Sequence, residues 1–199
     1  MISTPGSDTG GMLPFEGSAE ICKIVADLFL KWEVTTFVET GTQRGATASW
    51  ANCRVHRVVT IESDKDRFLE SFENLKNSGV IVYLGPSEEL LELIHFKNEE
   101  TILFFLDAHS MQGTPIVAEL RAIGHLIKKF SITPILCIHD IEVPGKPELG
   151  FDHYEDGTVL NLDRIKPALS ELGMDDWNIG FNSIPDGAAR GFCYITPKP

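Results

Sequence analysis

The chain has 199 residues, of which 43% are hydrophobic, and its 17 Lys and Arg residues against 29 Asp and Glu residues give a formal net charge of −12 at pH 7. This length and mixture suit one globular domain with a full core, and no apolar run approaches the roughly 20 residues that cross a bilayer, which argues against a membrane protein. The negative charge would repel a phosphate backbone and argues against nucleic acid as a partner.

The first residues and the cysteines bear on where the protein works. Residues 1–14 have no basic start and no apolar stretch, unlike a secretory signal, and we expect a flexible arm ahead of a single domain at 15–199. The four cysteines lack the CxxC spacing of a zinc site and fall mostly in apolar segments, as reduced core thiols do. They are Cys22, Cys53, Cys137 and Cys193. These features predict a cytoplasmic protein.

From residue 18 onward, helical and strand patterns alternate along the chain. Helical spacing over 18–32 is followed by a β-branched strand at 35–39 and a glycine-containing turn at 41–45 that leads into a helix. The alternation continues with strands at 57–62, 80–84, 101–106 and 134–138 and helices at 64–77, 87–95 and 115–130. Nearly apolar strands separated by helices predict a parallel sheet that is covered on both faces.

The C-terminal third departs from this pattern. A loop rich in Pro and Gly at 141–157 precedes a helix at 161–172, and two short apolar runs follow at 177–181 and 191–195. Runs so close together can pair only as an antiparallel hairpin. The sequence therefore predicts an α/β fold in three layers: a Rossmann-like seven-stranded sheet, mostly parallel, with a C-terminal antiparallel β-hairpin.

The turn after the first strand carries the strongest motif. Glu39 ends the strand, Gly41 permits a tight turn, and Gly45 lets the next helix begin close to a ligand. A carboxylate at this point can pair with a cationic group of that ligand. The alternative is an ordinary strand–turn–helix corner with a solvated glutamate.

A second acidic residue ends the next strand. Glu62 lies 23 positions after Glu39. An acid roughly 20 residues past a glycine turn hydrogen-bonds both ribose hydroxyls in nucleoside-binding α/β folds, so Glu62 is expected to hold a ribose. Asp64 is expected to cap the helix that follows.

The segment from Glu39 to Gly45 resembles the ExGxxxG motif of small-molecule O-methyltransferases, including the catechol and macrolide-sugar types, and the predicted sheet matches that of class I S-adenosylmethionine-dependent methyltransferases. The resemblance implies S-adenosylmethionine as cofactor, with Glu39, Gly41, Thr42 and Gly45 at its methionine end. It also implies an adenine contact after the third strand, where Pro86 replaces the usual acid and leaves the main chain and Ser87. A helix N-cap explains Ser87 equally well.

The fourth and fifth strands each end in an acid and a histidine. Asp107 and His109 follow the fourth strand, and His139 and Asp140 follow the fifth. Because open α/β folds bind their ligands at this edge, the four side chains could hold Mg²⁺ or another divalent cation that lowers the pKa of an acceptor oxygen. Alternatively, Asp107 anchors substrate or cofactor, and His139 and Asp140 form a hydrogen-bonded pair without an ion.

The resemblance bears on both the metal and the general base. Metal-dependent O-methyltransferases have an Asp after strand four and an Asp followed by Asn or Asp after strand five; Asp107 and Asp140 match, but Ile141 cannot coordinate. Either a histidine completes the site or there is no metal. The lysine that serves the catechol enzymes is also missing after Asp107, which leaves His109 as the best base because imidazole titrates near neutral pH. Uncharacterised and antibiotic-tailoring proteins with LDAH and (I/V)HD segments look most similar.

Two later segments are expected to close over the site. The long loop at 142–155, with Phe151, His153 and Tyr154, is predicted to form a lid that selects the acceptor, and Arg190 precedes the last strand. The sequence thus predicts methyl transfer from S-adenosylmethionine to an oxygen of a small-molecule acceptor, with catalysis by Asp107, His109 and Asp140. A catalytically silent binding protein and an NAD-dependent oxidoreductase are the alternatives. A further expectation left open by the sequence is a homodimer, in which a partner subunit adds walls to the pocket.

Overall fold

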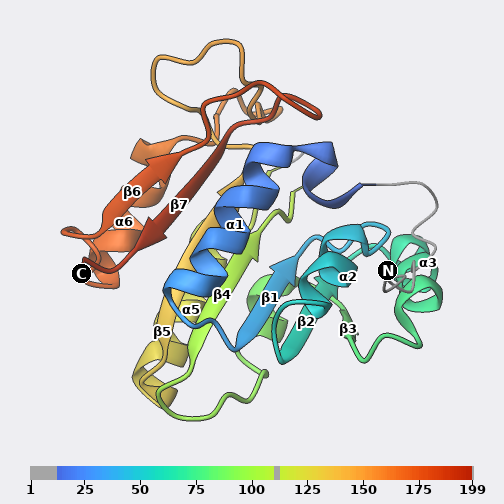
Figure 1. Ribbon diagram of the computed structural model, residues 1–199. Helices are drawn as coiled ribbons and strands as arrows, with labels where there is room; N and C mark the ends of the chain where they lie inside the picture. Colours follow the sequence, from blue (N-terminus) through green and yellow to red (C-terminus); the bar gives the residue numbers. More distant parts are fainter. Residues whose placement is uncertain (1–12, 110–112, 199) are drawn as a thin grey trace.

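The fold is that of a computed structural model, which describes residues 13–109 and 113–198. In this part of the chain, seven strands form one sheet in the order β3-β2-β1-β4-β5-β7-β6 (Figure 1). The strands are β1 (Thr36–Thr40), β2 (Arg57–Glu62), β3 (Ile81–Leu84), β4 (Thr101–Leu106), β5 (Thr133–His139), β6 (Asn178–Phe181) and β7 (Phe192–Thr196). The first five run parallel, and β7 is antiparallel to β5 and β6. The predicted fold class is confirmed.

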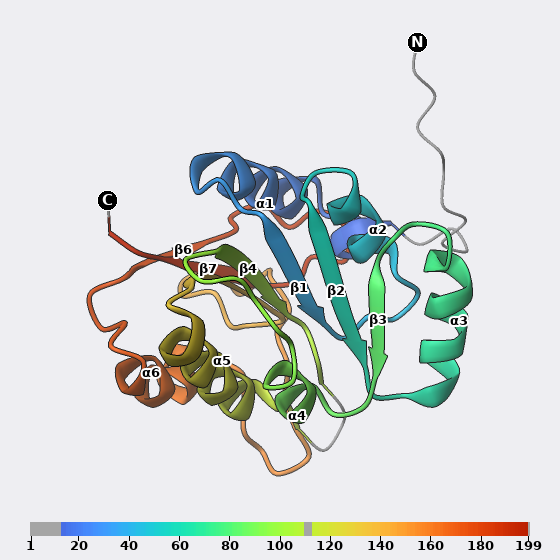
Figure 2. The ribbon, with the colours of Figure 1, turned by 90° about the horizontal axis from the view of Figure 1, so that it is seen from below.

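Helices cover both faces of the sheet. They are the 3₁₀ helix η1 (Pro14–Gly17), α1 (Ala19–Lys31), α2 (Ala46–Asn52), α3 (Lys65–Leu75), α4 (Ser87–Leu91), α5 (Ile116–Phe130) and α6 (Leu162–Glu171). Figure 2 shows α1 and α2 on one face, α4, α5 and α6 on the other, and α3 beside β3. None of the helices among the described residues is long and apolar enough to cross a bilayer. The first 12 residues of the expected arm lie outside the described part of the chain.

Successive strand residues point to opposite faces and build two separate cores. Phe37 and Phe105 belong to the core beneath α1 and α2, whereas Val38 and Phe104 belong to the core beneath α5 and α6. All five residues of β1 are buried, as expected for a central parallel strand. This rigid centre fixes the positions of the strand ends that bear the site.

The helix boundaries follow their capping residues, with one correction. Asp64 caps α3 as predicted, because its carboxylate accepts hydrogen bonds from the backbone N–H groups of the next turn. The helix predicted at 87–95 is shorter, since α4 ends at Leu91 and the chain then turns. Ile94 and Phe96 still bury their side chains in the core, which explains why apolar spacing continues past the helix end.

The loop between β6 and β7 docks on the beginning of α1. The Asp186 carboxylate accepts hydrogen bonds from the Ser18 hydroxyl (2.6 Å) and from the N–H groups of Ala19 (2.8 Å) and Glu20 (3.0 Å). Gly187 allows the contact, because its φ is +56° and a Cβ there would lie 2.5 Å from the Ser18 nitrogen. The docked loop holds η1 at the carboxyl edge of the sheet.

The long connection after β5 is an ordered loop rather than an open one. The N–H of Glu142 donates to Leu160 O (2.8 Å), and the N–H of Tyr154 donates to Thr158 O (2.9 Å). Tyr154 is buried in the core, whereas Phe151 packs its ring against His153 with centroids 4.5 Å apart. The loop therefore has a fixed structure, but Phe151, His153 and Tyr154, the residues predicted to form a lid, do not line the pocket at the sheet edge.

Candidate functional site

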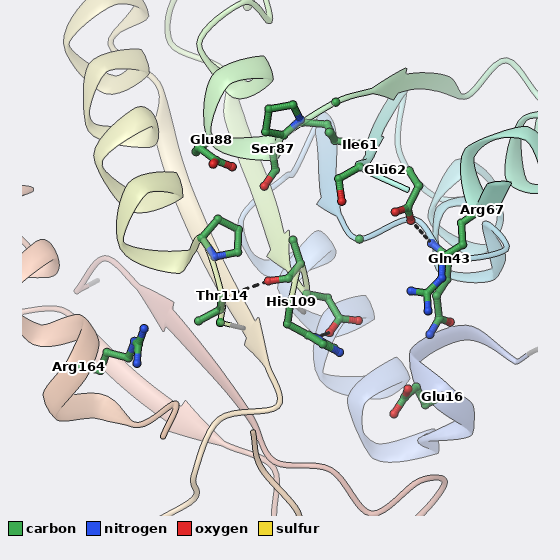
Figure 3. Close-up of a pocket in the computed structure, with 18 residues that line it drawn as sticks. Glu16, Gln43, Ile61, Glu62, Arg67, Ser87, Glu88, His109, Thr114 and Arg164 are labelled. Atoms are coloured by element: carbon green, nitrogen blue, oxygen red, sulfur yellow. Dashed lines mark hydrogen bonds and ion pairs between the residues drawn. The ribbon is translucent and has the colours of Figure 1, made fainter. Parts of the chain in front are cut away.

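A cavity of about 490 Å³ opens at the carboxyl ends of β1 to β4. Figure 3 shows Gln43, Glu62 and Arg67 at one end of the cavity, Thr114 and Arg164 at the other, and His109 between them. Open α/β sheets bind ligands at this edge, so the cavity is the candidate site. Eight of its lining residues come directly after strands β1, β2, β3 and β4: Gly41, Gln43, Ser63, Gly85, Pro86, Asp107, Ala108 and His109.

The turn after β1 brings the backbone close to the end of β4. Gly41 has a φ of +82°, and a Cβ there would lie 2.6 Å from Asp107 O. Only glycine fits this close approach without displacing one of the two strand ends. Gly41 lines the cavity, as the motif predicted.

Glu62 lies at the cavity wall with its carboxylate held by the backbone. One oxygen accepts from the N–H of Gln43 (2.9 Å), and the other accepts from the N–H of Asp64 (3.0 Å). A carboxylate oxygen has a second lone pair, so both oxygens can still accept from a pair of hydroxyl groups. This geometry suits the ribose contact predicted for Glu62.

Glu39 does not line the cavity, which corrects the expected contact with the cofactor's ammonium group. Its side chain accepts a hydrogen bond from the Thr60 hydroxyl (2.6 Å), and Thr60 in turn lies 2.6 Å from the hydroxyl of Thr42. The Glu39 residue is 2% exposed, and burial raises its pKa to about 8. A carboxyl that is enclosed and largely protonated at neutral pH is a poor partner for an ammonium ion.

Thr42 and Gly45 have structural roles as well. The Thr42 side chain is buried against Thr60 and lies outside the cavity lining. Gly45 begins α2 with a φ of +83°, and a Cβ there would lie 2.6 Å from Leu75 Cδ1. Its missing side chain therefore makes room for α3, not for a ligand as predicted.

Ser87 lines the cavity and is supported by a residue that sequence reasoning missed. Its hydroxyl donates to Glu119 Oε1 (2.5 Å), so it is not the N-cap considered as an alternative; Pro86 holds that position. Glu119 is 1% exposed, and burial raises its pKa to about 7. Its Oε2 has no hydrogen-bond partner among the described residues. The sequence did contain a sign of Glu119, because this acid lies on the apolar face of α5 at helical spacing from Ile116 and Ile123.

The four side chains predicted after β4 and β5 do meet. His109 Nδ1 lies 4.0 Å from Asp107 Oδ1 and 3.5 Å from Asp140 Oδ2. His139 Nδ1 lies 3.2 Å from Asp107 Oδ1 and 3.4 Å from Asp140 Oδ1. Burial disfavours a charged His139, but the two neighbouring carboxylates raise its pKa well above the ordinary value. Its Nδ1 nevertheless makes no hydrogen bond of good geometry among the described residues.

Two further charged residues complete this cluster. Arg190 donates from Nε to Asp140 Oδ1 and from Nη2 to Asp152 Oδ1. Asp152 Oδ2 lies 3.6 Å from His109 Nδ1. Burial alone would raise the pKa of Asp140, but His139 and Arg190 hold it well below its usual range. The sequence pointed to Arg190 only by its position before the last strand, and to Asp152 only as part of the predicted lid.

The donor atoms for a divalent cation are present, but their other partners do not suit one. Ligand atoms of Asp107, His109 and Asp140 lie within 4.8 Å of one another. The guanidinium of Arg190 already pairs with Asp140 and places a positive charge beside the donor atoms. Ile141 is fully buried in the core and offers no ligand. With Arg190 in place, the cluster does not fit a divalent cation.

Glu16 reaches the cavity from η1 and carried no signal in the sequence. Its backbone has a φ of +51°, and its carbonyl accepts a hydrogen bond from Ala188 N (3.2 Å). Burial raises the pKa of Glu16. The residue joins the site because two sets of contacts hold η1 over the sheet edge. They are the β6–β7 loop and the burial of Phe15, whose N–H donates to the Thr47 hydroxyl (3.0 Å).

Comparison with known proteins supports the fold through structure alone. No protein-family model matches the chain, and no curated protein matches it in sequence. Solved structures do match. A Klebsiella pneumoniae protein whose assignment as an O-methyltransferase is provisional has a TM-score of 0.66 and 16% identity, with 100% of this chain and 92% of that one covered.

Two ligand-bound structures are similar over most of their length. The O-methyltransferase TomG from Streptomyces achromogenes, solved with S-adenosylmethionine, gives a TM-score of 0.64 at 16% identity, covering 92% of this chain and 81% of that one. An O-methyltransferase from Bacillus cereus, solved with S-adenosylhomocysteine, gives 0.62 at 17% identity, covering 96% and 87%. The chain therefore has the fold of class I S-adenosylmethionine-dependent O-methyltransferases.

Proposed function

We propose that this chain transfers the methyl group of S-adenosylmethionine to an oxygen of a small-molecule acceptor. The observation that carries the proposal is the carboxylate of Glu62, which the backbone holds at the wall of a cavity that also contains His109. A diol-binding acid and a titratable base in one cavity are what a nucleoside cofactor and a hydroxyl acceptor require. The shared fold supports this reading but does not by itself establish an activity.

The cofactor would occupy the side of the cavity bounded by β1, β2 and β3. Glu62 would bind the ribose hydroxyls, and Ser87 would lie beside the adenine. The tight turn at Gly41 would leave room for the methionine end, where Asp107 meets the acceptor side. The positively charged sulfonium of the cofactor supplies a reactive methyl group, so the protein has mainly to align the acceptor with it.

His109 would act as the general base toward the acceptor hydroxyl. Its Nδ1 faces the carboxylates of Asp107, Asp140 and Asp152 at 3.5–4.0 Å, which orients the ring and leaves Nε2 for the acceptor. The acceptor oxygen would form its bond to the methyl carbon while its proton passes to Nε2. Asp107 and Asp140 would stabilise the imidazolium that results, as carboxylates paired with catalytic histidines do.

The far end of the cavity would select the acceptor. Thr114 and Arg164 line it, and the Arg164 guanidinium donates to the Thr158 hydroxyl (2.6 Å). A cytoplasmic location, a single domain at 15–199 and a homodimer stay predictions. A divalent cation has no part in the proposed reaction, because Arg190 already pairs with Asp140, one of the carboxylates expected to bind it.

Thermal unfolding with S-adenosylhomocysteine and, in parallel, with NAD tests the cofactor. A ligand at 100 times its Kd stabilises a protein by about 2.7 kcal/mol, which corresponds to roughly 5–10 °C for a chain of this length. We expect this shift with S-adenosylhomocysteine only. A shift with NAD alone would favour an oxidoreductase instead, and no shift with either would favour a catalytically silent fold.

Transfer of a labelled methyl group to a panel of hydroxylated acceptors tests the reaction. His109→Ala should lower turnover by roughly 10²–10⁴-fold, the usual contribution of a general base, while the affinity for S-adenosylhomocysteine stays within about threefold. An equal loss of cofactor binding would contradict the role given to His109. Turnover that is unaffected by the substitution would also remove it from the mechanism.

A further inference from the structure

Arg190 forms the centre of an ion-pair network at the ends of β4 and β5. Its Nε and Nη2 donate to Asp140 and Asp152, and the side chains are 27%, 5% and 14% exposed for the arginine and the two acids. An arginine uses its rigid fork of donors to hold two carboxylates at fixed positions. The burial of both acids means that this charge neutralisation is little screened by solvent.

The backbone around Arg190 is built to hold it there. The N–H of Gly150 donates to Ala189 O (2.7 Å), and the N–H of Gly191 donates to Gly150 O (2.7 Å), so the long loop is fastened on both sides of the arginine. A Cβ on Gly150 would lie 3.1 Å from Arg190 Nη1. The glycine therefore leaves room for the guanidinium group.

Each carboxylate divides its two oxygens between Arg190 and His109. Asp140 uses Oδ1 for Arg190 and has Oδ2 3.5 Å from His109 Nδ1. Asp152 uses Oδ1 for Arg190 and has Oδ2 3.6 Å from His109 Nδ1. A divalent cation bound to these acids would have to displace Arg190 or lie beside it, and the nearby positive charges would repel each other.

We propose that the guanidinium of Arg190 takes the place of a divalent cation at this site, so that the protein binds no metal there and uses Asp140 and Asp152 to orient His109. Arg190 is then a positioning residue that acts through two carboxylates. The role given to His109 rests on the proposed function. The exclusion of a metal ion does not, because it depends only on the charges in the folded chain.

Titration of the full-length protein with Mn²⁺, followed by the electron paramagnetic resonance signal of free Mn²⁺, tests the proposal. The wild type should show no saturable binding at millimolar Mn²⁺. Arg190→Gln removes the charge but keeps hydrogen-bonding capacity, and it should create one saturable site with an apparent Kd roughly tenfold or more below the highest Mn²⁺ concentration used for the wild type. Asp140→Asn added to this variant should abolish the new site.

Two controls separate the role of Arg190 from a general loss of positive charge. Arg164→Gln removes an arginine from the same cavity, but Arg164 does not pair with these acids, so no Mn²⁺ site should appear. Arg190→Lys keeps the charge and should bind no Mn²⁺ either. A structural defect alone would not create a metal site that depends on Asp140.

Either of two results overturns the proposal. One is saturable Mn²⁺ binding to the wild type that Asp140→Asn removes, and this result can be obtained even if Arg190→Gln fails to fold. The other is a folded Arg190→Gln protein that gains no site. Thermal shifts with S-adenosylhomocysteine are recorded on the same samples, so a failure of the proposed cofactor is seen separately from a failure of the arginine.

Discussion

The two glutamates predicted to hold the cofactor have different surroundings. Glu62 receives two backbone N–H groups and borders the cavity, whereas Glu39 is sealed beneath it with Thr60. Both lie near a strand end and both fit a motif, so spacing alone could not separate them. The two side chains point to the same face of the sheet, since Glu39 pairs with Thr60 and Glu62 lies two positions after Thr60. The difference arises because Glu62 is the last residue of β2, whereas Glu39 lies one position before the end of β1. Ser87 lines the cavity and its adenine contact stays a prediction, whereas its buried partner Glu119 was not predicted.

Replacing glutamate by glutamine should affect cofactor binding at Glu62 but not at Glu39. Glu62→Gln should weaken S-adenosylhomocysteine binding by about tenfold to a hundredfold, because a hydrogen bond to a charged acceptor is worth roughly 1.5–3 kcal/mol. Glu39→Gln should change the affinity by less than about threefold, and it serves as the matched control. Isothermal titration calorimetry measures both. Loss of binding in Glu39→Gln would restore its predicted contact with the cofactor.

Buried carboxyl groups make the stability depend on pH. Burial raises the pKa of Glu119 to about 7, with the nearby acids Glu88 and Asp107 adding to the effect, and it raises the pKa of Glu39 to about 8, against an ordinary value of 4.5. The folded chain thus keeps protons that the unfolded chain releases, so the stability from these groups is complete below about pH 4.5 and is lost as the pH rises to 7–8.

Glu119→Gln should therefore lose less stability than the wild type between pH 5 and pH 8. Each unit of pKa difference corresponds to about 1.4 kcal/mol, so the two curves should diverge by an amount on the order of 1–3 kcal/mol. Urea denaturation at several pH values measures the divergence. Glu155→Gln, on the exposed part of the long loop, should follow the wild-type curve. If the free energy of unfolding of Glu119→Gln changed with pH just as that of the wild type does, Glu119 would be charged in the folded protein.

Among the elements, the strands and the long helices were predicted well, whereas the end of α4 and the docked helix η1 were not. The parallel strands and the long helix α5 (Ile116–Phe130) match their predicted bounds within one residue at each end. The end of α4 was missed because Ile94 and Phe96 stay buried after the helix stops. Nothing in the apolar pattern marks η1 or the loop that holds it, since side-chain hydrogen bonds between distant segments leave no period in a sequence.

The contact between the β6–β7 loop and α1 gives a prediction about stability. Asp186→Ala removes a carboxylate that accepts three hydrogen bonds at the helix start, and it should lower the free energy of unfolding by about 1–2 kcal/mol. Asp176→Ala is the control, because that aspartate is almost fully exposed. Thermal or urea unfolding measures the change. Equal stability of the two variants would mean that the docked loop contributes little.

At the scale of the whole molecule, the parallel sheet explains which parts of the site were predictable. Once five parallel strands are recognised, their carboxyl ends must meet at one edge, and Asp107, His109, His139 and Asp140 therefore meet as predicted. Asp152, Arg190 and Glu16 reach the same place through loops whose course depends on tertiary contacts. Arg190 and the loop that contains Asp152 were expected to close over the site, but the ion pair between them was not predicted, and Glu16 carried no signal.

The docked loop also affects the order in which the protein can be completed during synthesis. Asp186 follows Ser18 by 168 residues, so at about 5–20 residues per second the beginning of α1 waits on the order of 10–30 s for the carboxylate that accepts its hydrogen bonds. The strands whose ends position Gly41, Glu62 and Asp107 leave the ribosome well before then. A nascent chain can thus form the proposed cofactor half of the cavity early, while the wall made by η1 and Arg190 is assembled only after residue 190 has been synthesised.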